Sequence, residues 1–213
     1  MWQIFGNVGC MHVQSVVHIL VQVKVKGQVC AGKKIHVILL DAENAESEII
    51  ASKYIQECQL MSDLCHPNVT LFIGVCFFPN YQLPVLVMEK LERNLDDLVE
   101  KVPNISLALK HSILEDVARG LLYLHKHNPQ IIHRDLTARN VLLTPSMVAK
   151  ITDFGNSRMM QSDKLVQTLS RCPGTSVYMP PEALTPSPCY GPSLDVFSFG
   201  HLSLFVGLQV CKS

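Results

Sequence analysis

The stretch "IIHRDLTARNVLL", residues 131–143, places polar side chains between two apolar runs. Its polar members include His133, Arg134, Asp135 and Asn140, and isoleucine, valine and leucine flank them. Burying a charged group costs free energy unless the group is paired. We therefore interpret this stretch as a candidate functional site.

The composition of the 213-residue chain limits its class. Its hydrophobic content of 48% is ample for a core, and its length suits one large domain or two small lobes. Lys and Arg together number 18 and so do Asp and Glu, so electrostatics give no reason to expect nucleic acid or an anionic membrane as a partner.

The eight cysteines form no C-x-x-C pair and no zinc-ligand spacing, so reduced, mostly buried thiols are expected. The apolar run at residues 197–210 is shorter than the ~20 residues that a membrane helix needs. We expect a cytoplasmic protein without a membrane span, and its oligomeric state stays open.

The first part of the chain predicts a small sheet with one helix. β-branched residues on both sides of Lys26-Gly27-Gln28 predict a hairpin over residues 21–40. Residues 45–64 have helical periodicity, which ends before Pro67. Residues 70–78 and 83–91 predict two further strands.

The second part is mainly helical. Residues 106–127 carry an apolar stripe, which predicts a long half-buried helix and consists of Leu109, Ile113, Val117, Leu121 and Leu124. The quoted stretch follows, then "AKITDFGNSR", a polar segment, and a Pro-rich region that enters a last helix. We expect a first lobe over residues 1–90, with residues 1–20 atypical, and a second lobe over 91–213.

Two charged residues of the first lobe fall on apolar faces. Alternation along the strand places Lys33 with the apolar Val29, Ala31, Ile35 and Val37, whereas Lys34 shares its face with Cys30, Gly32 and His36. In the helix, Glu57 belongs to a stripe whose other members are Ile50, Tyr54, Met61 and Leu64.

An inward ammonium and an inward carboxylate favour pairing, because removing one partner of a buried pair costs roughly 3–5 kcal/mol. The alternative is that Lys33 extends its charge to solvent and that Glu57 lies at the edge of its stripe.

"HRDLTARN", residues 133–140, and "DFG", residues 153–155, resemble the catalytic loop and the metal-binding loop of eukaryotic protein kinases. Four fixed letters in register arise by chance about once in 160,000 starts, and a nearby DFG lowers this about a thousandfold. The resemblance extends through "HPNV", "LVMEKL", "GTSVYMPPE" and "DVFSFG". It implies an α+β, bilobal fold with a small sheet-plus-helix lobe and a mainly helical lobe, together forming one kinase domain.

The resemblance also implies ATP and Mg²⁺ as cofactors and a protein as substrate. Lys33 would hold the α- and β-phosphates and pair with Glu57. Asp135 would accept the proton of the substrate hydroxyl, and Asn140 and Asp153 would ligate Mg²⁺.

Adenine would lie between Ala31 and Leu142. Glu89 and Leu91 resemble the hinge positions whose backbone meets adenine, and Met88 would guard the pocket behind them.

Further positions resemble structural and regulatory parts of the family. His133, Phe154 and Met61 resemble an internal packing spine. Thr168 and Ser170 lie in the interval of the activation loop, where phosphorylation could order the segment against Arg134, although most such hydroxyls are merely solvated.

The motifs point to different phosphate acceptors. Ala138-Arg139-Asn140 resembles tyrosine kinases, whereas "GTSVYMPPE" resembles Ser/Thr kinases, with Thr175 near the catalytic aspartate. The tyrosine-kinase-like group of Ser/Thr kinases fits both best, and tyrosine as acceptor stays open.

Two departures leave a second hypothesis open. Residues 10–26 contain no glycine, although the Gly-rich phosphate loop belongs just before the Lys33 strand. The chain also stops soon after "DVFSFG", so the last helices of the larger lobe are missing and the domain looks truncated. The alternatives are a signalling kinase and a non-catalytic, pseudokinase-like binding module or inactive fragment.

Overall fold

The computed structural model describes residues 8–13, 18–35, 45–78, 83–160, 178–181 and 191–208. The chain divides into two compact units. The first comprises residues 1–65 and 70–91, and the second comprises residues 66–69 and 92–213. None of the helices in the described ranges has the length and apolar character needed to cross a bilayer.

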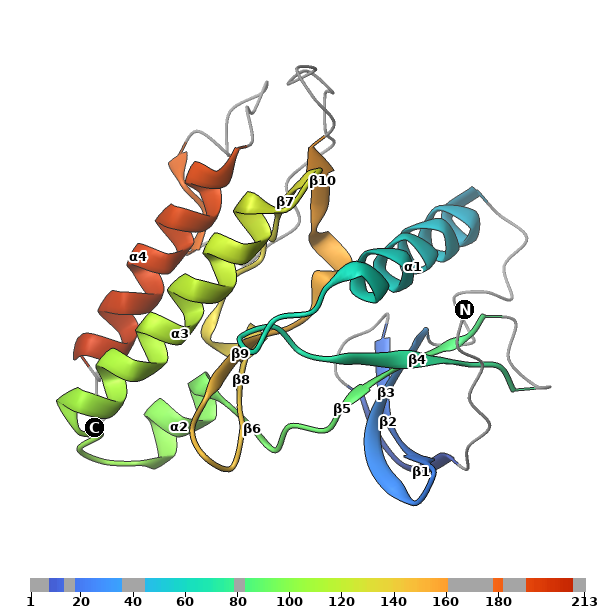
Figure 1. Ribbon diagram of the computed structural model, residues 1–213, viewed down its shortest axis with the longest axis horizontal. Helices are drawn as coiled ribbons and strands as arrows, with labels where there is room; N and C mark the ends of the chain where they lie inside the picture. The colour runs from blue at the N-terminus through green and yellow to red at the C-terminus, as the bar shows by residue number, and fades with distance from the viewer. Residues whose placement is uncertain are drawn as a thin grey trace. The chain divides into compact units, whose positions relative to one another are not determined.

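The first unit is an antiparallel sheet with one helix (Figure 1). Its elements are β1 (Val8–Val13), β2 (His18–Val25), β3 (Gln28–Ile35), α1 (Ala45–Asp63), β4 (Phe72–Cys76) and β5 (Val85–Glu89). The strand order is β1-β2-β3-β5-β4. Strand β1 was not predicted, because the sequence before residue 18 lacks regular alternation.

The predicted hairpin is confirmed in strands β2 and β3, which pair from His18 and Ile35 to Val25 and Gln28. Lys26 and Gly27 form its turn, and both have positive φ angles, 49° and 86°. Such a two-residue turn matches the right-handed twist of the strands, and glycine adopts its second position without strain. Residues 36–40 of the prediction lie outside the described residues.

One apolar cluster of the sheet lies on the face of β3 that carries Cys30 and Gly32, which is the face where alternation places Lys34. The cluster comprises the buried residues Ile19, Val21, Val23, Cys30, Cys76, Val85 and Val87. A Cβ at Gly32 would lie 2.7–2.9 Å from the side chains of Val23, Val21 and Val85. The valines of β2 and β5 make this face apolar, and alternation along β3 alone does not contain that information. Lys34 is buried as well.

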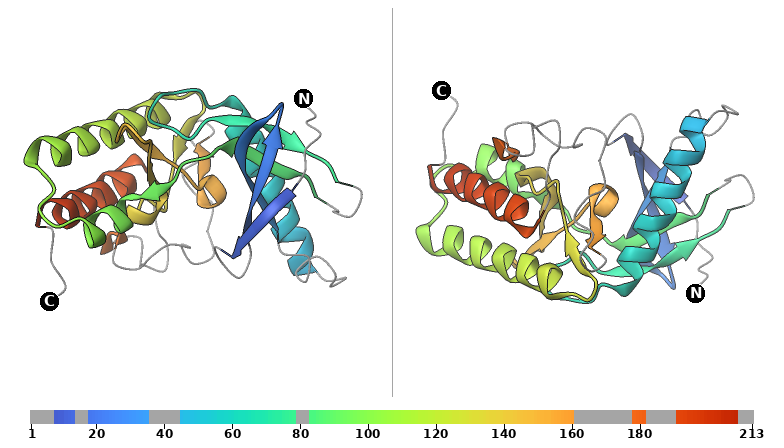
Figure 2. Two further views of the ribbon diagram at one scale, coloured as in Figure 1. Left: turned by 90° about the horizontal axis from the view of Figure 1, so that it is seen from below. Right: turned by 90° about the horizontal axis from the view of Figure 1, so that it is seen from above.

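Helix α1 lies against one face of this sheet (Figure 2) and confirms the helix predicted over residues 45–64. Its predicted inward stripe is largely correct, because Tyr54, Glu57 and Met61 are buried and Ile50 is half-buried.

The second unit consists of helices and short strands. They are β6 (Arg93–Asn94), α2 (Leu95–Lys101), α3 (Leu107–Lys126), β7 (Gln130–Ile132), the 3₁₀ turn η2 (Ala138–Asn140), β8 (Val141–Leu143), β9 (Ala149–Ile151), the 3₁₀ turn η3 (Phe154–Asn156), β10 (Arg158–Met160) and α4 (Pro192–Leu208). Helices α3 and α4 run side by side (Figures 1 and 2). Strands β6, β8 and β9 form one small sheet, and β7 pairs with β10.

Helix α3 confirms the long helix predicted over residues 106–127. Ser106 caps it by accepting a hydrogen bond from the Leu109 amide. Its buried face carries Ile113, Val117, Gly120, Leu121 and Leu124. A Cβ at Gly120 would lie 2.8 Å from the Asn68 carbonyl oxygen, so the glycine permits close contact between the helix and residues 66–69.

Candidate active site

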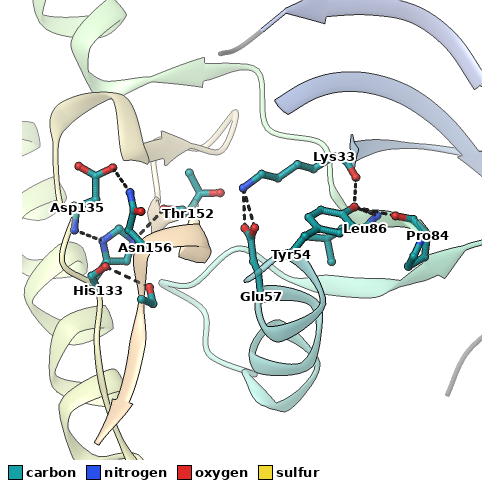
Figure 3. Close-up of polar contacts among 10 residues, drawn as sticks. Lys33, Tyr54, Glu57, Pro84, Leu86, His133, Asp135, Thr152 and Asn156 are labelled. Carbon is teal, nitrogen blue, oxygen red and sulfur yellow. Dashed lines mark hydrogen bonds and ion pairs between the residues drawn. The ribbon is translucent and has the colours of Figure 1, made fainter. Parts of the chain in front are cut away.

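The candidate residues of the first unit form an ion pair between β3 and α1. The Lys33 Nζ atom lies 2.7 Å and 3.0 Å from the two carboxylate oxygens of Glu57 (Figure 3). Lys33 is 3% exposed and Glu57 is 4% exposed. The predicted pair therefore forms, and the alternative of a solvent-directed lysine is wrong.

Two titratable side chains near this pair, Cys58 and Tyr54, are neutral. Burial, together with the negative charge of Glu57, raises the pKa of the Cys58 thiol to about 12, although Lys33 acts in the opposite direction. Burial also raises the pKa of Tyr54 well above its usual value. Both side chains remain protonated at neutral pH, so Cys58 is not a nucleophile.

The candidate residues of the second unit lie in the loop between β7 and β8, within the stretch of residues 131–143. Asp195 of α4 is fully buried, and its carboxylate accepts hydrogen bonds of 2.8 Å from the backbone amides of His133 and Arg134. The same carboxylate lies 2.8 Å from His125 Nε2 on α3. Arg134 has a φ of 69°, a left-handed conformation that costs free energy in a non-glycine residue, and the bonds to Asp195 hold it there.

Asp195 is a site residue that the sequence analysis did not single out. The available signal was a carboxylate in the first turn of a helix that has no other Asp, Glu, Lys or Arg, because a buried carboxylate needs partners.

His133 connects this loop to the segment of "DFG". Its Nε2 lies 3.0 Å from the Thr152 carbonyl oxygen, and its ring packs edge-on against Phe154 at 5.1 Å. Its Nδ1 accepts a hydrogen bond from the Asp135 amide. His133 and Phe154 are thus packing residues of the second unit, as expected, and Met61 is buried within the first.

Two asparagines hold Asp135. The Asn140 amide donates to the backbone carbonyl of Asp135 at 2.8 Å, and the Asn156 amide donates to its carboxylate Oδ2 at 3.2 Å (Figure 3 shows the second contact). Asn156 was not predicted. The sequence offered one indication of this role, which is that a polar residue directly follows "DFG".

Asp153 and Asn140 come from neighbouring backbone segments, because the Thr152 amide donates to the Asn140 carbonyl. The Asn140 amide nitrogen is engaged with Asp135, which leaves its side-chain oxygen for a ligand. Asp153 has a left-handed backbone, with φ 65° and ψ 76°. An amide oxygen and a carboxylate suit a hard divalent cation, which takes oxygen ligands.

No group of three or more His, Cys, Asp and Glu side chains within the described ranges is arranged to hold a metal ion. Two protein oxygens nevertheless suffice for Mg²⁺, which keeps several waters and takes further ligands from phosphates. The residues present therefore fit a cation that binds together with a nucleotide.

The residues expected around adenine are divided between the two units. In the first unit, Ala31 pairs with Met88 across β3 and β5, and Glu89 ends β5. The Glu89 amide donates to the Leu71 carbonyl at 3.0 Å, and the Glu89 carboxylate accepts from the Leu71 amide at 2.7 Å. Leu91 is half-buried in the first unit, and Leu142 is half-buried in β8 of the second.

Several predicted positions lie outside the described residues. These are Thr168, Ser170 and Thr175. Arg134 is buried. Partial burial of Arg158, and after it the positive charge of Arg134, lowers the pKa of Arg158.

Comparison with known proteins identifies relatives across most of the chain. A family model described as protein tyrosine and serine/threonine kinase matches residues 13–205. The dual specificity protein kinase shkC of Dictyostelium discoideum is 35% identical over 80% of this chain and 33% of that protein. In Arabidopsis thaliana, cysteine-rich receptor-like protein kinase 44 is 35% identical over 84% of this chain and 48% of that protein. The chain spans between a third and a half of the length of these two relatives.

Proposed function

The chain belongs to the protein tyrosine and serine/threonine kinase family, and from this membership we propose that it transfers the γ-phosphoryl group of ATP to hydroxyl groups of proteins. The observation that carries the proposal is the buried ion pair between Lys33 and Glu57. A buried pair of this kind often adds little stability over apolar residues, so a role in binding phosphate accounts for it better than stability does.

The proposed chemistry needs positioning and charge neutralisation more than covalent catalysis. ATP and Mg²⁺ would supply the phosphoryl group and neutralise its charge. Lys33, oriented by Glu57, would hold the α- and β-phosphates, and the side-chain oxygens of Asn140 and Asp153 would hold the metal.

Asp135 takes the proton of the acceptor hydroxyl. Its carboxylate suits this task because the Asn156 amide holds Oδ2 from one side and the Asn140 amide fixes its backbone. A base held in one orientation loses little entropy when it accepts the proton.

The acceptor is proposed to be serine or threonine. The relatives include proteins named as Ser/Thr and dual-specificity kinases, and the chain combines a tyrosine-kinase-like loop with a Ser/Thr-like "GTSVYMPPE". We further propose a cytoplasmic signalling role. The free thiols of Cys30 and Cys58 support it, since such thiols persist in a reducing compartment.

The experiment that tests this function measures phosphate transfer from ATP and Mg²⁺ to generic Ser/Thr peptides, with Asp135→Asn beside the unsubstituted chain. Removal of a general base lowers the rate about 10²- to 10⁴-fold, so the variant should lose transfer by at least a hundredfold. Asp97→Asn is the matched control, because Asp97 is a surface carboxylate of α2 that pairs with Lys101.

An unsubstituted chain that melts cooperatively but transfers no phosphate would contradict the proposal. It would favour the non-catalytic binding module.

A further inference from the structure

The hydroxyl of Tyr54 connects α1 to two strands of the sheet. Tyr54 is 2% exposed, and its oxygen lies 2.5 Å from the Lys33 carbonyl oxygen, 2.9 Å from the Pro84 carbonyl oxygen and 3.0 Å from the Leu86 amide nitrogen (Figure 3). A buried hydroxyl without partners would be costly, and here it contacts backbone groups of β3 and β5.

The protonation state of this hydroxyl fixes its role in these bonds. Burial raises the pKa of Tyr54, so the oxygen keeps its single hydrogen. It accepts a hydrogen bond from the Leu86 amide and donates to one of the two carbonyls at a time, of which that of Lys33 is nearer. The hydroxyl thus bridges a donor on β5 and an acceptor on β3.

The bridge is located beside the ion pair. Lys33 and Leu86 are the last residues in the register of β3 with β5. Tyr54 precedes Glu57 by three residues on α1, so both side chains lie on one face of the helix, about one turn apart. The contacts close a ring: the Lys33 backbone binds Tyr54, Tyr54 and Glu57 share a helix, and Glu57 binds the Lys33 ammonium.

We propose that Tyr54 is a positioning residue whose hydroxyl fixes α1 on the sheet and thereby holds Glu57 against Lys33. The proposal rests on the proposed kinase function, which it deepens. A phenylalanine would fill the same space and bury the same ring, so packing does not explain the oxygen. Apolar packing is non-directional, whereas hydrogen bonds to Lys33 and Leu86 specify one position of the helix along the strands.

The function depends on this position, because a displacement of about 1 Å in a catalytic constellation can cost about a hundredfold in rate. Tyr54→Phe keeps the ring and removes the bridge. We expect kcat/KM for ATP to fall about tenfold and the Leu86 amide to exchange its hydrogen about tenfold faster, since that amide loses its acceptor.

Val23→Ala is the matched control. Val23 is buried in the cluster on the sheet face opposite Lys33, so its truncation destabilises the sheet without touching the bridge. Both variants are measured at the same interval below their own melting temperatures. A Tyr54→Phe variant with kcat/KM within twofold of the Val23→Ala value would overturn the proposal.

Combination with Glu57→Gln separates positioning from general stability. If Tyr54 acts through Glu57, its substitution should change kcat/KM less than twofold when Glu57 is already replaced, whereas Val23→Ala should keep its full effect. Full additivity of Tyr54→Phe with Glu57→Gln would contradict the proposed route.

Hydrogen exchange tests the positioning role of Tyr54 independently of kinase activity. If the unsubstituted chain transfers no phosphate, the kinase function fails, and unchanged exchange at Leu86 and along α1 in Tyr54→Phe would overturn the positioning role separately. If the Tyr54→Phe variant does not fold, hydrogen exchange is measured instead in the unsubstituted chain under mild denaturant. The Leu86 amide and the amides of α1 should then exchange through one shared opening, with the same opening free energy. Different opening free energies would refute the bridge.

Discussion

At the scale of single residues, the carboxylate of Asp195 determines the backbone of the loop at His133 and Arg134. Both of its oxygens accept backbone hydrogen bonds, and it is fully buried. Asp195→Asn replaces one acceptor with an NH₂ group that faces another N–H. A buried polar group without a partner costs about 1–3 kcal/mol, so we expect the free energy of unfolding to fall by about 2–3 kcal/mol in urea titration.

The control for this prediction is Asp96→Asn. Asp96 pairs with Arg139, whose side chain is 81% exposed, and exposed pairs contribute about 0–1 kcal/mol. Equal losses of stability in the two variants would show that burial of the Asp195 carboxylate does not matter.

At the scale of elements, replacement of glycine by alanine should change the unfolding free energy in opposite directions at two helical positions. Glycine in a helix interior costs about 0.8–1.0 kcal/mol relative to alanine. A Cβ atom at Gly200 of α4 would have open space around it, with nothing within 4 Å, so Gly200→Ala should raise the unfolding free energy by about that amount. Gly120 of α3 faces the Asn68 carbonyl, which belongs to backbone and does not yield easily.

We therefore expect Gly120→Ala to lower the unfolding free energy by about 1–3 kcal/mol, the usual cost of overpacking. Urea titration of both variants measures the difference, and each variant is the other's control because the chemical change is identical. A stabilising Gly120→Ala would mean that α3 moves away from residues 66–69 at little cost.

At the scale of the whole molecule, binding of ATP and Mg²⁺ should raise the melting temperature. A ligand at about a hundred times its Kd stabilises the native state by ≈ 2.7 kcal/mol, and 1 kcal/mol corresponds to about 2–4 °C in a protein of this size. The expected shift is about 5–10 °C. Asp153→Asn should lose most of it because that carboxylate is the proposed metal ligand, whereas Asp135→Asn should keep it.

The absence of glycine from residues 10–26 makes this measurement informative. If Asp153→Asn shows the same rise in melting temperature, the nucleotide does not bind through a metal ion held by Asp153. The lack of any shift in a cooperatively melting chain would mean that a phosphate loop without glycine does not retain the nucleotide.

Local features of this protein were determined by the sequence alone. The hairpin around Lys26 and Gly27, the helices α1 and α3, and the inward directions of Lys33 and Glu57 follow from periodicity and turn chemistry, which act over a few residues. The motifs around Asp135 and Asp153 identified the family for the same reason, since their residues are close in sequence.

The tertiary structure alone decided which distant groups meet. It brought Asp195 to the loop at His133, the Tyr54 hydroxyl to the backbone of Lys33 and Leu86, and valines from two other strands to the face of Cys30 and Gly32. Such partners come from separate elements, and no pattern within one element specifies its neighbour. Hydrogen bonds and close packing act only at contact distance, so they are defined once the chain has folded.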